Sequence, residues 1–210
     1  MSRPPRPSPR PAHGGAGQIR IIGGRWRNTR LQVPDLPGLR PTGERVRETL
    51  FNWLMPKIAG ARVLDLFAGS GALGLEAVSR GAASAVLVER DPGLAAQLRQ
   101  QVARLDAGAQ VQVVQADAMA WLRQPGQGDF DVAFVDPPFA AGLWDAVLES
   151  LPARLAGSAW LYLESPQDAH PRPPADWHPH REGTTREVHY ALYRRAAGTL
   201  RDDLNPTADA

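Results

Sequence analysis

The sequence contains no cysteine, and that absence excludes several classes of protein. It rules out a disulfide scaffold, a zinc site with cysteine ligands and a catalytic thiol. No run of residues approaches the roughly 18 consecutive apolar positions that a membrane span requires. The arginines near the N-terminus precede no apolar segment, so they do not form a secretory signal. We therefore expect a soluble cytoplasmic protein that does not contact a membrane.

Lysine is nearly absent too, since Lys57 is the one lysine among 24 basic residues. The formal net charge of +2 hides an uneven distribution along the chain. Residues 1–57 carry ten arginines and Lys57 against three acidic residues, a net charge of +8, whereas residues 58–210 carry a net charge of −6. A basic segment on an acidic body is typical of a protein that binds a polyanion such as a nucleic acid.

The length of 210 residues and the hydrophobic content of 43% predict one medium-sized domain with a short extension. The proline-rich residues 1–17 indicate a disordered basic tail, and residues 197–210 indicate a flexible C-terminal tail. Between these tails we expect an N-terminal extension at residues 18–57 and a larger domain at residues 58–196. No heptad pattern indicates an obligate dimer, so we expect a monomer.

The N-terminal extension should contain a β-hairpin followed by a helix. Residues 19–33 alternate weakly around a Gly-Gly pair, with aliphatic residues on both sides of the turn. Thr42 is a suitable N-cap for a helix that runs to about Met55 and is ended by Pro56.

From Arg62 onward, short apolar strands alternate with helices. The strands are apolar on both faces, which predicts a parallel sheet covered by helices on both sides. After Glu164 the alternation stops, and two further strands without a helix between them predict an antiparallel hairpin at the sheet edge. The expected strands are 62–67, 85–89, 111–115, 131–135, 159–164, 177–182 and 187–194. The expected helices are 72–80, 92–105, 118–123 and 143–155.

A glycine-rich loop follows the first of these strands. Gly69, Gly71 and Gly74 form the pattern G-x-G-x-x-G, with Ser70 between the first two, in a strand–loop–helix context. The glycines permit a tight turn and a close approach of the backbone to a ligand. Glu89 ends the next strand, where its carboxylate can accept hydrogen bonds from the two hydroxyls of a ribose. This pattern alone fits NAD and S-adenosylmethionine equally well.

Two further carboxylates favour S-adenosylmethionine over NAD. Asp65 precedes the glycines, where it would repel a pyrophosphate but suits a sulfonium cofactor that bears an ammonium group. Asp117 follows the third strand, where it can accept a hydrogen bond from the 6-amino group of adenine. Because the carboxyl ends of parallel strands meet at one edge, Asp65, Glu89 and Asp117 should lie together at the ligand crevice.

The fourth strand ends in the sequence Asp136-Pro-Pro-Phe139. Two consecutive prolines remove two N–H donors and fix the backbone. Asp136 and the carbonyl oxygen of Pro137 can then both accept hydrogen bonds from one exocyclic amine, while Phe139 can stack on an unpaired base. Two acceptors favour the pyramidal amine, whose lone pair attacks a methyl group, and they stabilise the positive charge that develops on nitrogen.

This chemistry requires neither a metal nor a covalent intermediate. Methylation at carbon 5 of a pyrimidine generally uses a cysteine nucleophile, and the chain has none. Direct transfer to an amine nitrogen is the reaction that remains consistent with the sequence. In-line alignment of the nitrogen and the sulfonium methyl group would supply the rest of the rate.

Several segments together resemble the RsmD family, the bacterial guanine-N2 methyltransferases of 16S ribosomal RNA. The glycine loop within residues 65–77 and the V-D-P-P-F run at residues 135–139 are shared by many amine methyltransferases. The N-terminal segments I-R-I-I-G-G, R-P-T and R-V-R-E-T-L-F-N-W-L are the specific part of the resemblance. It extends from about Gln18 to Arg195, which leaves out the two tails.

The resemblance implies a class I S-adenosylmethionine-dependent, Rossmann-like sheet of seven strands, mostly parallel, with an antiparallel edge hairpin. By similarity, Asp65 and the first two glycines of the loop approach the methionine part of the cofactor, Glu89 binds the ribose, and Asp117 with Ala118 binds the adenine. The residues expected to hold the guanine amine are Asp136, Pro137 and Phe139. Arg40 and Thr42 would lie near the cofactor or the entering RNA.

The expected partner is 16S ribosomal RNA, either free or within an assembling small ribosomal subunit. Arginine suits bidentate phosphate contacts, and an indole can stack on a base. The candidate RNA surface consists of Arg20, Arg25, Trp26, Arg27, Arg30, Arg40, Thr42, Arg45 and Arg47. Contacts to phosphates predict an affinity that falls steeply with salt concentration.

Three other functions are weighed against ribosomal RNA methylation. A DNA adenine-N6 or cytosine-N4 methyltransferase shares the glycine loop and the Pro-Pro motif, but 210 residues leave little room for a separate target-recognition domain. A non-catalytic RNA-binding assembly module would not need the complete set of site residues. A nicotinamide oxidoreductase is disfavoured by Asp65 and by the motif at Asp136.

Overall fold

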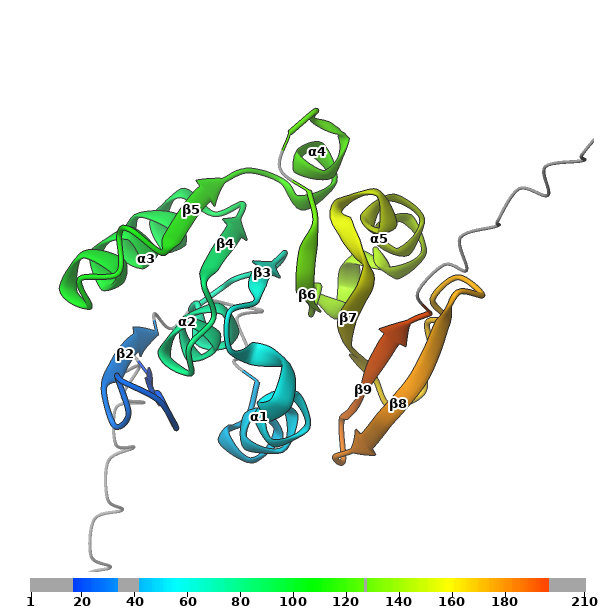
Figure 1. The fold of residues 1–210 in the computed structure, drawn as a ribbon, viewed down its shortest axis with the longest axis horizontal. Helices are drawn as coiled ribbons and strands as arrows, with labels where there is room; N and C mark the ends of the chain where they lie inside the picture. Colours follow the sequence, from blue (N-terminus) through cyan, green and yellow to red (C-terminus); the bar gives the residue numbers. More distant parts are fainter. Residues whose placement is uncertain (1–16, 34–41, 127, 197–210) are drawn as a thin grey trace, which may run out of the picture.

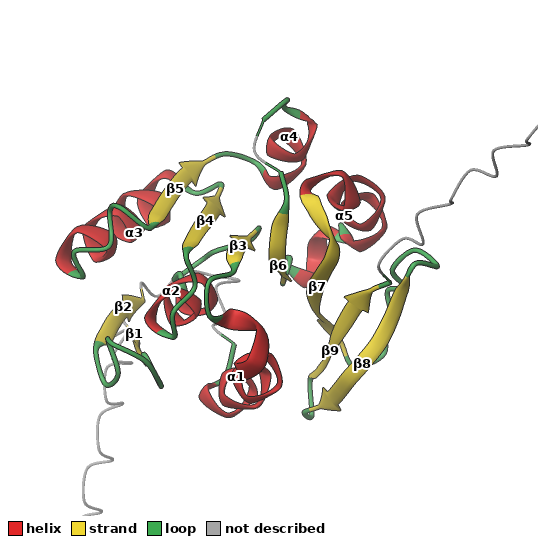
Figure 2. Cartoon of the chain, viewed as in Figure 1, coloured by secondary structure: helices red, strands yellow, loops and turns green. Residues whose placement is uncertain are grey.

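The computed structural model of the chain describes residues 17–33, 42–126 and 128–196 (Figure 1). They form one seven-stranded sheet with helices on both faces and a separate two-stranded sheet at the N-terminal end, as Figure 2 shows. In these residues no helix combines the length and the apolar character needed to cross a bilayer. The α/β architecture predicted from the sequence is confirmed, whereas the two predicted tails lie almost entirely outside the described residues.

The large sheet has the strand order β5-β4-β3-β6-β7-β9-β8. Its strands are β3 (Arg62–Asp65), β4 (Ser84–Glu89), β5 (Val111–Gln115), β6 (Phe130–Val135), β7 (Leu155–Pro166), β8 (Trp177–Thr184) and β9 (Val188–Arg195). Strand β9 pairs antiparallel with both β7 and β8, which confirms the predicted hairpin at the edge. The strand order reverses between β3 and β6, and such a switch point is where α/β sheets bind ligands.

Helices cover the sheet on both faces. They are α1 (Glu44–Ile58), α2 (Ala72–Ser79), α3 (Pro92–Arg104), α4 (Ala118–Arg123) and α5 (Trp144–Ser150). One hydrophobic core joins α1, α2 and α3 to one face of the sheet, and a second joins α4 and α5 to the other (Figure 1). The α-helical hydrogen bonding of α5 stops earlier than predicted and continues as a 3-10 turn to Arg154, because Pro152 has no N–H to donate.

The N-terminal hairpin of β1 (Gly17–Arg20) and β2 (Arg30–Val33) is present as predicted. Two details of the following helix differ from expectation. Helix α1 begins at Glu44 behind Gly43 and has no side-chain cap, so the prediction that Thr42 caps it is wrong. The prediction that Pro56 ends the helix is also wrong. Pro56 lies in the last turn, where its missing N–H removes only one helical hydrogen bond.

The N-terminal extension is joined to the larger domain by a buried carboxylate. Glu76 on α2 is fully buried and accepts hydrogen bonds from the backbone N–H groups of Ile22 at 2.7 Å and Gly23 at 2.8 Å. Its oxygens also pair with Arg80 Nε at 2.7 Å and Arg47 Nη1 at 3.6 Å. Ile21 and Leu31 of the hairpin belong to the same hydrophobic core as α1 and the sheet. The extension therefore shares its core with the larger domain.

Gly24 shows how closely the extension approaches α2. Its φ is +76°, a conformation that favours glycine, and a Cβ atom there would lie 1.8 Å from the carbonyl oxygen of Ser79. The next residue, Arg25, donates its backbone N–H to that oxygen at 2.8 Å. The Ser79 hydroxyl in turn donates to the carbonyl oxygen of Gly23 at 2.6 Å. The hairpin is thus held by the backbone at the end of α2.

Candidate active site

Asp65 ends the central strand β3, directly before the glycine loop. Its carboxylate is buried and accepts the backbone N–H of Gly74 at 2.9 Å. The pKa of Asp65 is raised to about 7, mainly by burial; the Gly74 N–H acts against this shift and the charge of Glu89 adds to it. A buried carboxylate with a raised pKa, at the switch point of the sheet, is suited to a cationic ligand.

The glycine loop turns sharply between β3 and α2. Gly69 and Gly71 have φ values of +52° and +76°. A Cβ at Gly71 would lie 2.6 Å from a methyl carbon of Leu98, and one at Gly74 would lie 2.9 Å from a methyl carbon of Leu87. Gly71 and Gly74 therefore let α2 pack closely against its neighbours, and the first two glycines also form the turn itself.

Glu89 ends β4 beside this loop and is held in a fixed orientation. Its Oε2 accepts the backbone N–H of Gly69 at 2.9 Å, and its Oε1 accepts that of Asp91 at 2.7 Å. The side chain remains partly exposed. Because each carboxylate oxygen has two lone pairs, both oxygens keep the capacity to accept from a vicinal diol.

Asp117 follows β5 and has a structural role that the sequence pattern did not reveal. It is the N-cap of α4, where its Oδ1 accepts the backbone N–H of Ala120 at 3.0 Å. The side chain is exposed, so its second oxygen faces solvent at the same edge as Glu89, while Ala118 is buried beneath it. The structure thus places the predicted cofactor residues after three consecutive strands.

Asp136 follows β6, the strand next to β3, and is in contact with the N-terminal extension. The hydroxyl of Thr42 donates to its Oδ2 at 3.4 Å. Burial raises the pKa of Asp136 well above its usual range; the charges of Glu164 and Asp65 raise it further, and the hydrogen bond from Thr42 lowers it. The charges of acidic residues on β3 and β7 therefore act on Asp136 at this edge.

Phe139 gives the motif an exposed aromatic surface. Its side chain is 36% exposed, whereas Pro137 before it is buried. The Phe139 ring lies against that of Trp144 at a centroid distance of 6.0 Å. An exposed aromatic ring beside hydrogen-bond acceptors is the arrangement that holds a nucleobase by stacking.

One residue of this region was missed from sequence, and the contact of a second was not foreseen. Glu164 was read only as the end of a strand, although an acidic residue closing the fifth strand is the same signal that identified Asp65 and Glu89. Thr42 was included as an RNA-proximal residue, and its contact with Asp136 depends on two positions that are 94 residues apart in sequence.

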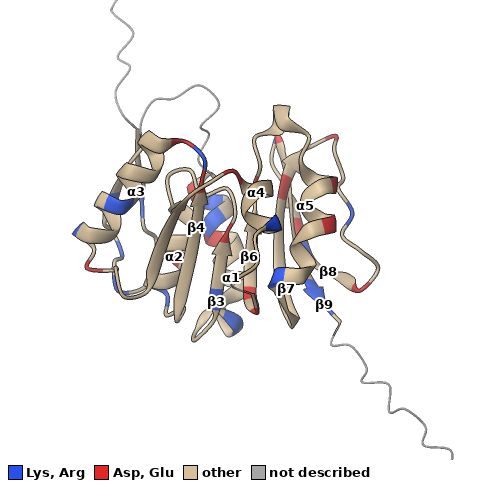
Figure 3. Ribbon diagram, turned by 90° about the horizontal axis from the view of Figure 1, so that it is seen from above, with Lys and Arg blue, Asp and Glu red and all other residues tan. Residues whose placement is uncertain are grey.

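The predicted RNA surface is only partly on the surface. The exposed members are Arg20, Arg25, Arg27, Arg30 and Arg45. Of these, Arg20 pairs with Glu44 and Arg25 contacts Gln110. The side chain of Trp26 packs against the main hydrophobic core. The guanidinium of Arg25 lies over the Trp26 ring, with its Cζ atom 4.1 Å from the ring centroid. Figure 3 shows basic segments also on α3 and on the β8–β9 hairpin.

Arg47 does not belong to that surface. Its side chain is 1% exposed and donates to the carbonyl oxygens of Arg20 at 3.0 Å and Thr42 at 3.3 Å, besides its ion pair with Glu76. The prediction that it faces RNA is wrong, because it serves to join α1, β1 and α2. Arg40 lies outside the described residues.

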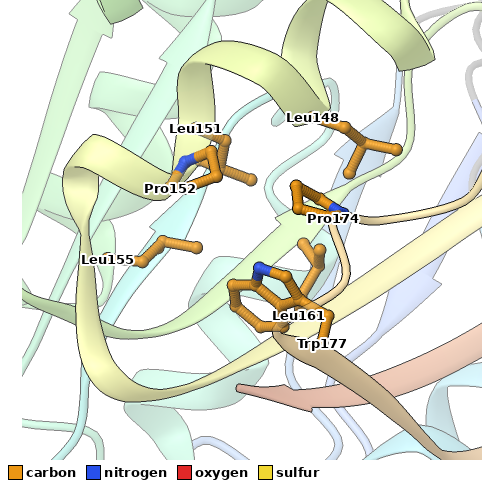
Figure 4. A pocket seen from close by; sticks show the side chains of 7 residues that line it. All are labelled: Leu148, Leu151, Pro152, Leu155, Leu161, Pro174 and Trp177. Atoms are coloured by element: carbon orange, nitrogen blue, oxygen red, sulfur yellow. The ribbon is translucent and has the colours of Figure 1, made fainter. Parts of the chain in front are cut away.

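A pocket under α5 is separate from the candidate active site. Its lining is apolar and consists of Leu148, Leu151, Pro152, Leu155, Leu161, Pro174 and Trp177 (Figure 4). The indole N–H of Trp177 is buried there without a hydrogen-bond partner among the described residues. No carboxylate or cation lines this pocket, so it offers no group for the chemistry that the strand ends suggest.

Comparison with known proteins identifies the family. A family model described as conserved hypothetical protein 95 matches residues 19–194. The ribosomal RNA small subunit methyltransferase D of Escherichia coli strain K12 is 51% identical over 191 residues, which cover 90% of this chain and 96% of that protein. The chain belongs to the ribosomal RNA small subunit methyltransferase D family. The family protein of Haemophilus influenzae is 42% identical over 182 residues, covering 85% of this chain and 94% of that protein.

Solved structures agree with this membership. The structure of yhhF from Escherichia coli is 49% identical, covers 86% of this chain and 99% of its own, and has a TM-score of 0.79. TrmN from Thermus thermophilus has a TM-score of 0.60 at 20% identity, which shows a shared fold alone. The sheet with its antiparallel edge strand is thus the class I methyltransferase fold, as expected for a member of the ribosomal RNA small subunit methyltransferase D family.

Proposed function

We propose that this protein transfers the methyl group of S-adenosylmethionine to the N2 amine of a guanine in 16S ribosomal RNA. The observation that carries the proposal is the position of Asp136 and Pro137 at the carboxyl end of β6, next to the glycine loop that follows β3. Acceptors for an amine and a site for a cationic cofactor thereby lie on adjacent strands. Family membership supports the methyltransferase reaction, and the names of the relatives support ribosomal RNA as substrate.

The residues of the cofactor site fit S-adenosylmethionine. Asp65 supplies a buried negative charge for a ligand that carries a sulfonium and an ammonium group, and Glu89 supplies two oriented acceptors for the ribose. Asp117 offers an exposed oxygen to the adenine amine, beside the buried Ala118. When bound, the cofactor supplies an electrophilic methyl group. Favourable interaction with its positive charge also helps to keep Asp65 and Asp136 ionised.

The motif residues prepare the amine for attack. The Asp136 carboxylate and the Pro137 carbonyl oxygen accept hydrogen bonds from the two N–H groups of the amine, which frees the nitrogen lone pair from the ring system. Phe139 stacks on the base, and Thr42 fixes the Asp136 carboxylate by its hydrogen bond. The protein needs to contribute alignment and charge stabilisation only, because the N–CH3 bond forms as the S–CH3 bond breaks and the sulfonium becomes a neutral thioether. The nitrogen then loses one proton, which Asp136 can accept and pass to solvent.

One experiment tests the reaction and the acceptor atom together. The protein is incubated with radiolabelled S-adenosylmethionine and small ribosomal subunits that lack the modification, and the digested RNA is separated into nucleosides. We expect label in N2-methylguanosine. Label in N6-methyladenosine or N4-methylcytidine would show that the protein methylates another base. Transfer to DNA under the same conditions would support a DNA methyltransferase instead. No transfer to either nucleic acid would favour a non-catalytic RNA-binding role.

A further inference from the structure

Glu164 lies beside Asp136 at the carboxyl end of the sheet. Strands β6 and β7 are parallel, with Val135 opposite Leu163, so the next residue on each strand is the acidic one. Val135 and Leu163 face the core under α4 and α5, whereas the alternate residues Phe134 and Tyr162 face the core under α1. The side chains of Asp136 and Glu164 therefore lie on the same face of the sheet, the face covered by α1. Thr42, which contacts Asp136, lies on this face too.

The Glu164 side chain is held in place from within the core. It is 6% exposed, and its Oε2 accepts the hydroxyl of Tyr162 at 2.8 Å. The backbone oxygen of Glu164 accepts the indole N–H of Trp144 at 2.9 Å, and the Trp144 ring lies against Phe139. Trp144 thus connects the aromatic ring proposed to stack on the base with the residue that carries this second carboxylate.

Two carboxylates at adjacent strand ends destabilise each other's ionised forms. After burial, the charge of Glu164 is the next largest cause of the raised pKa of Asp136. Burial is also the main cause of the raised pKa of Tyr162, followed by the charge of Glu164. A substrate edge that presents several N–H donors would stabilise the ionised forms of both carboxylates.

Among the RNA bases with an exocyclic amine, guanine alone has a ring N–H next to that amine. Its N1–H and N2 amine are adjacent donors on the Watson–Crick edge, whereas the corresponding ring nitrogens of adenine and cytosine carry lone pairs. A carboxylate next to the amine acceptors would accept from the guanine N1–H and would repel the lone pair of the other two bases. A carboxylate has about four lone-pair positions, so it can accept from several donors at once, the Tyr162 hydroxyl among them.

We propose that Glu164 is the residue that selects guanine, with its carboxylate accepting the N1–H while Asp136 and the Pro137 carbonyl hold the N2 amine. The inference rests on the proposed guanine-N2 reaction and assigns its specificity to one side chain. Asp136 and Pro137 recognise an amine that all three bases possess. Glu164 recognises the donor that distinguishes guanine from the other two.

The test uses a base that keeps the amine and loses the N1–H. Once the methylated position has been mapped, small subunits are reconstituted with 2-aminopurine at that position, and kcat/KM for methyl transfer is compared with that for guanine. We expect the unmodified protein to prefer guanine by at least about 100-fold, because a site built to accept a hydrogen bond strongly rejects an analogue that lacks the donor. Equal use of the two bases by this protein would overturn the proposal without any variant being made.

The variant Glu164→Gln separates the N1–H contact from the other differences between the bases. Its amide can donate to the ring nitrogen of 2-aminopurine, so the preference for guanine should shrink to about tenfold or less, mainly through a loss of activity on guanine. Tyr162→Phe is the matched control, because it removes the neighbouring hydroxyl but keeps the carboxylate and should keep the preference. An unchanged preference in a folded Glu164→Gln protein would refute the role of Glu164. Absence of N2-methylguanosine with the unmodified protein would instead refute the reaction itself.

Discussion

Glu76 and Asp65 are buried and Asp136 is half-buried, but the surroundings of these three carboxylates differ in kind. Glu76 meets two backbone N–H groups and two arginine side chains where the N-terminal extension joins α2. Asp65 meets a backbone N–H and Asp136 meets a hydroxyl, and within the described residues no basic side chain is recorded against either. The first carboxylate is compensated by the fold itself, whereas the other two are not.

The difference indicates which buried charges hold the structure and which serve a ligand. Removing a carboxylate from solvent without a counter-charge is costly, so the folded protein raises the pKa of Asp65 and Asp136. A cationic cofactor and the amine hydrogens of a base would supply the missing compensation. The carboxyl edge is therefore built for its bound state, and the junction at Glu76 is complete without a ligand.

Loss of the Asp136 carboxylate should have the largest effect of the changes that probe this comparison. We expect Asp136→Ala to lower methyl transfer about a thousandfold, because the amine loses an acceptor that stabilises its developing charge. Binding of S-adenosylmethionine, measured by calorimetry, should persist. Asp136→Asn keeps one acceptor oxygen and should retain more activity than the alanine variant. Full turnover by Asp136→Ala would show that the motif does not act on the amine.

Neutralising Glu76 should affect stability rather than chemistry. Glu76→Gln leaves Arg47 buried beside a neutral group, and we expect the free energy of unfolding to fall by about 3 kcal/mol in denaturant titrations. Glu44→Gln, in the exposed pair with Arg20, should cost less than about 1 kcal/mol. The double variant Glu76→Gln/Arg47→Met should recover part of the loss. Equal losses of stability from the Glu76 and Glu44 changes would show that the buried ion pair contributes no more than the exposed one.

The pKa of about 7 at Asp65 predicts a pH dependence of cofactor binding. A cationic ligand favours the ionised carboxylate, so affinity for S-adenosylmethionine should rise about tenfold per pH unit from pH 5 to pH 7 and level off above that. Asp65→Asn should abolish this rise, whereas Asp145→Asn, an exposed change on α5, should leave it intact. A flat profile for the unmodified protein would show that Asp65 does not sense the cofactor charge.

The same raised pKa has the opposite consequence for the protein without ligand. Between about pH 4 and pH 7 the folded protein holds a proton on Asp65 that the unfolded chain has released. Stability should therefore fall as the pH rises through this range and change little above it. Thermal unfolding of the Asp65→Asn variant should show a smaller decrease over the same interval.

The smallest effect is expected from the exposed arginines of the N-terminal extension. The double variant Arg27→Gln/Arg45→Gln should weaken binding to 16S RNA about fivefold and reduce the slope of log affinity against log salt by about two, as expected for two phosphate contacts. Cofactor affinity should not change. Arg181→Gln/Arg186→Gln, two exposed arginines of the β8–β9 hairpin, is the control with the same loss of charge. An equal effect there would show that no defined RNA surface exists on the extension.

The repeating pattern of the catalytic domain was readable from sequence because local features specify it. Runs apolar on both faces gave the parallel strands, and the glycine pattern and Pro-Pro motif placed two loops at strand ends. The absence of a helix between the last two strands predicted the edge hairpin. The start and end of α1 were misjudged because a threonine and a proline signal a boundary only when the neighbouring backbone uses them.

The sequence by itself determined the class I sheet, the glycine loop and the set of acidic residues that follow its strands. Only the tertiary structure decided that Arg47 pairs with Glu76 inside the protein, that Thr42 contacts Asp136, and that Glu164 stands next to Asp136. Each of these depends on which strands are neighbours and in which register, and on how a distant helix packs across them. Those relations are set by burying the whole apolar surface at once, so no local pattern in the chain encodes them.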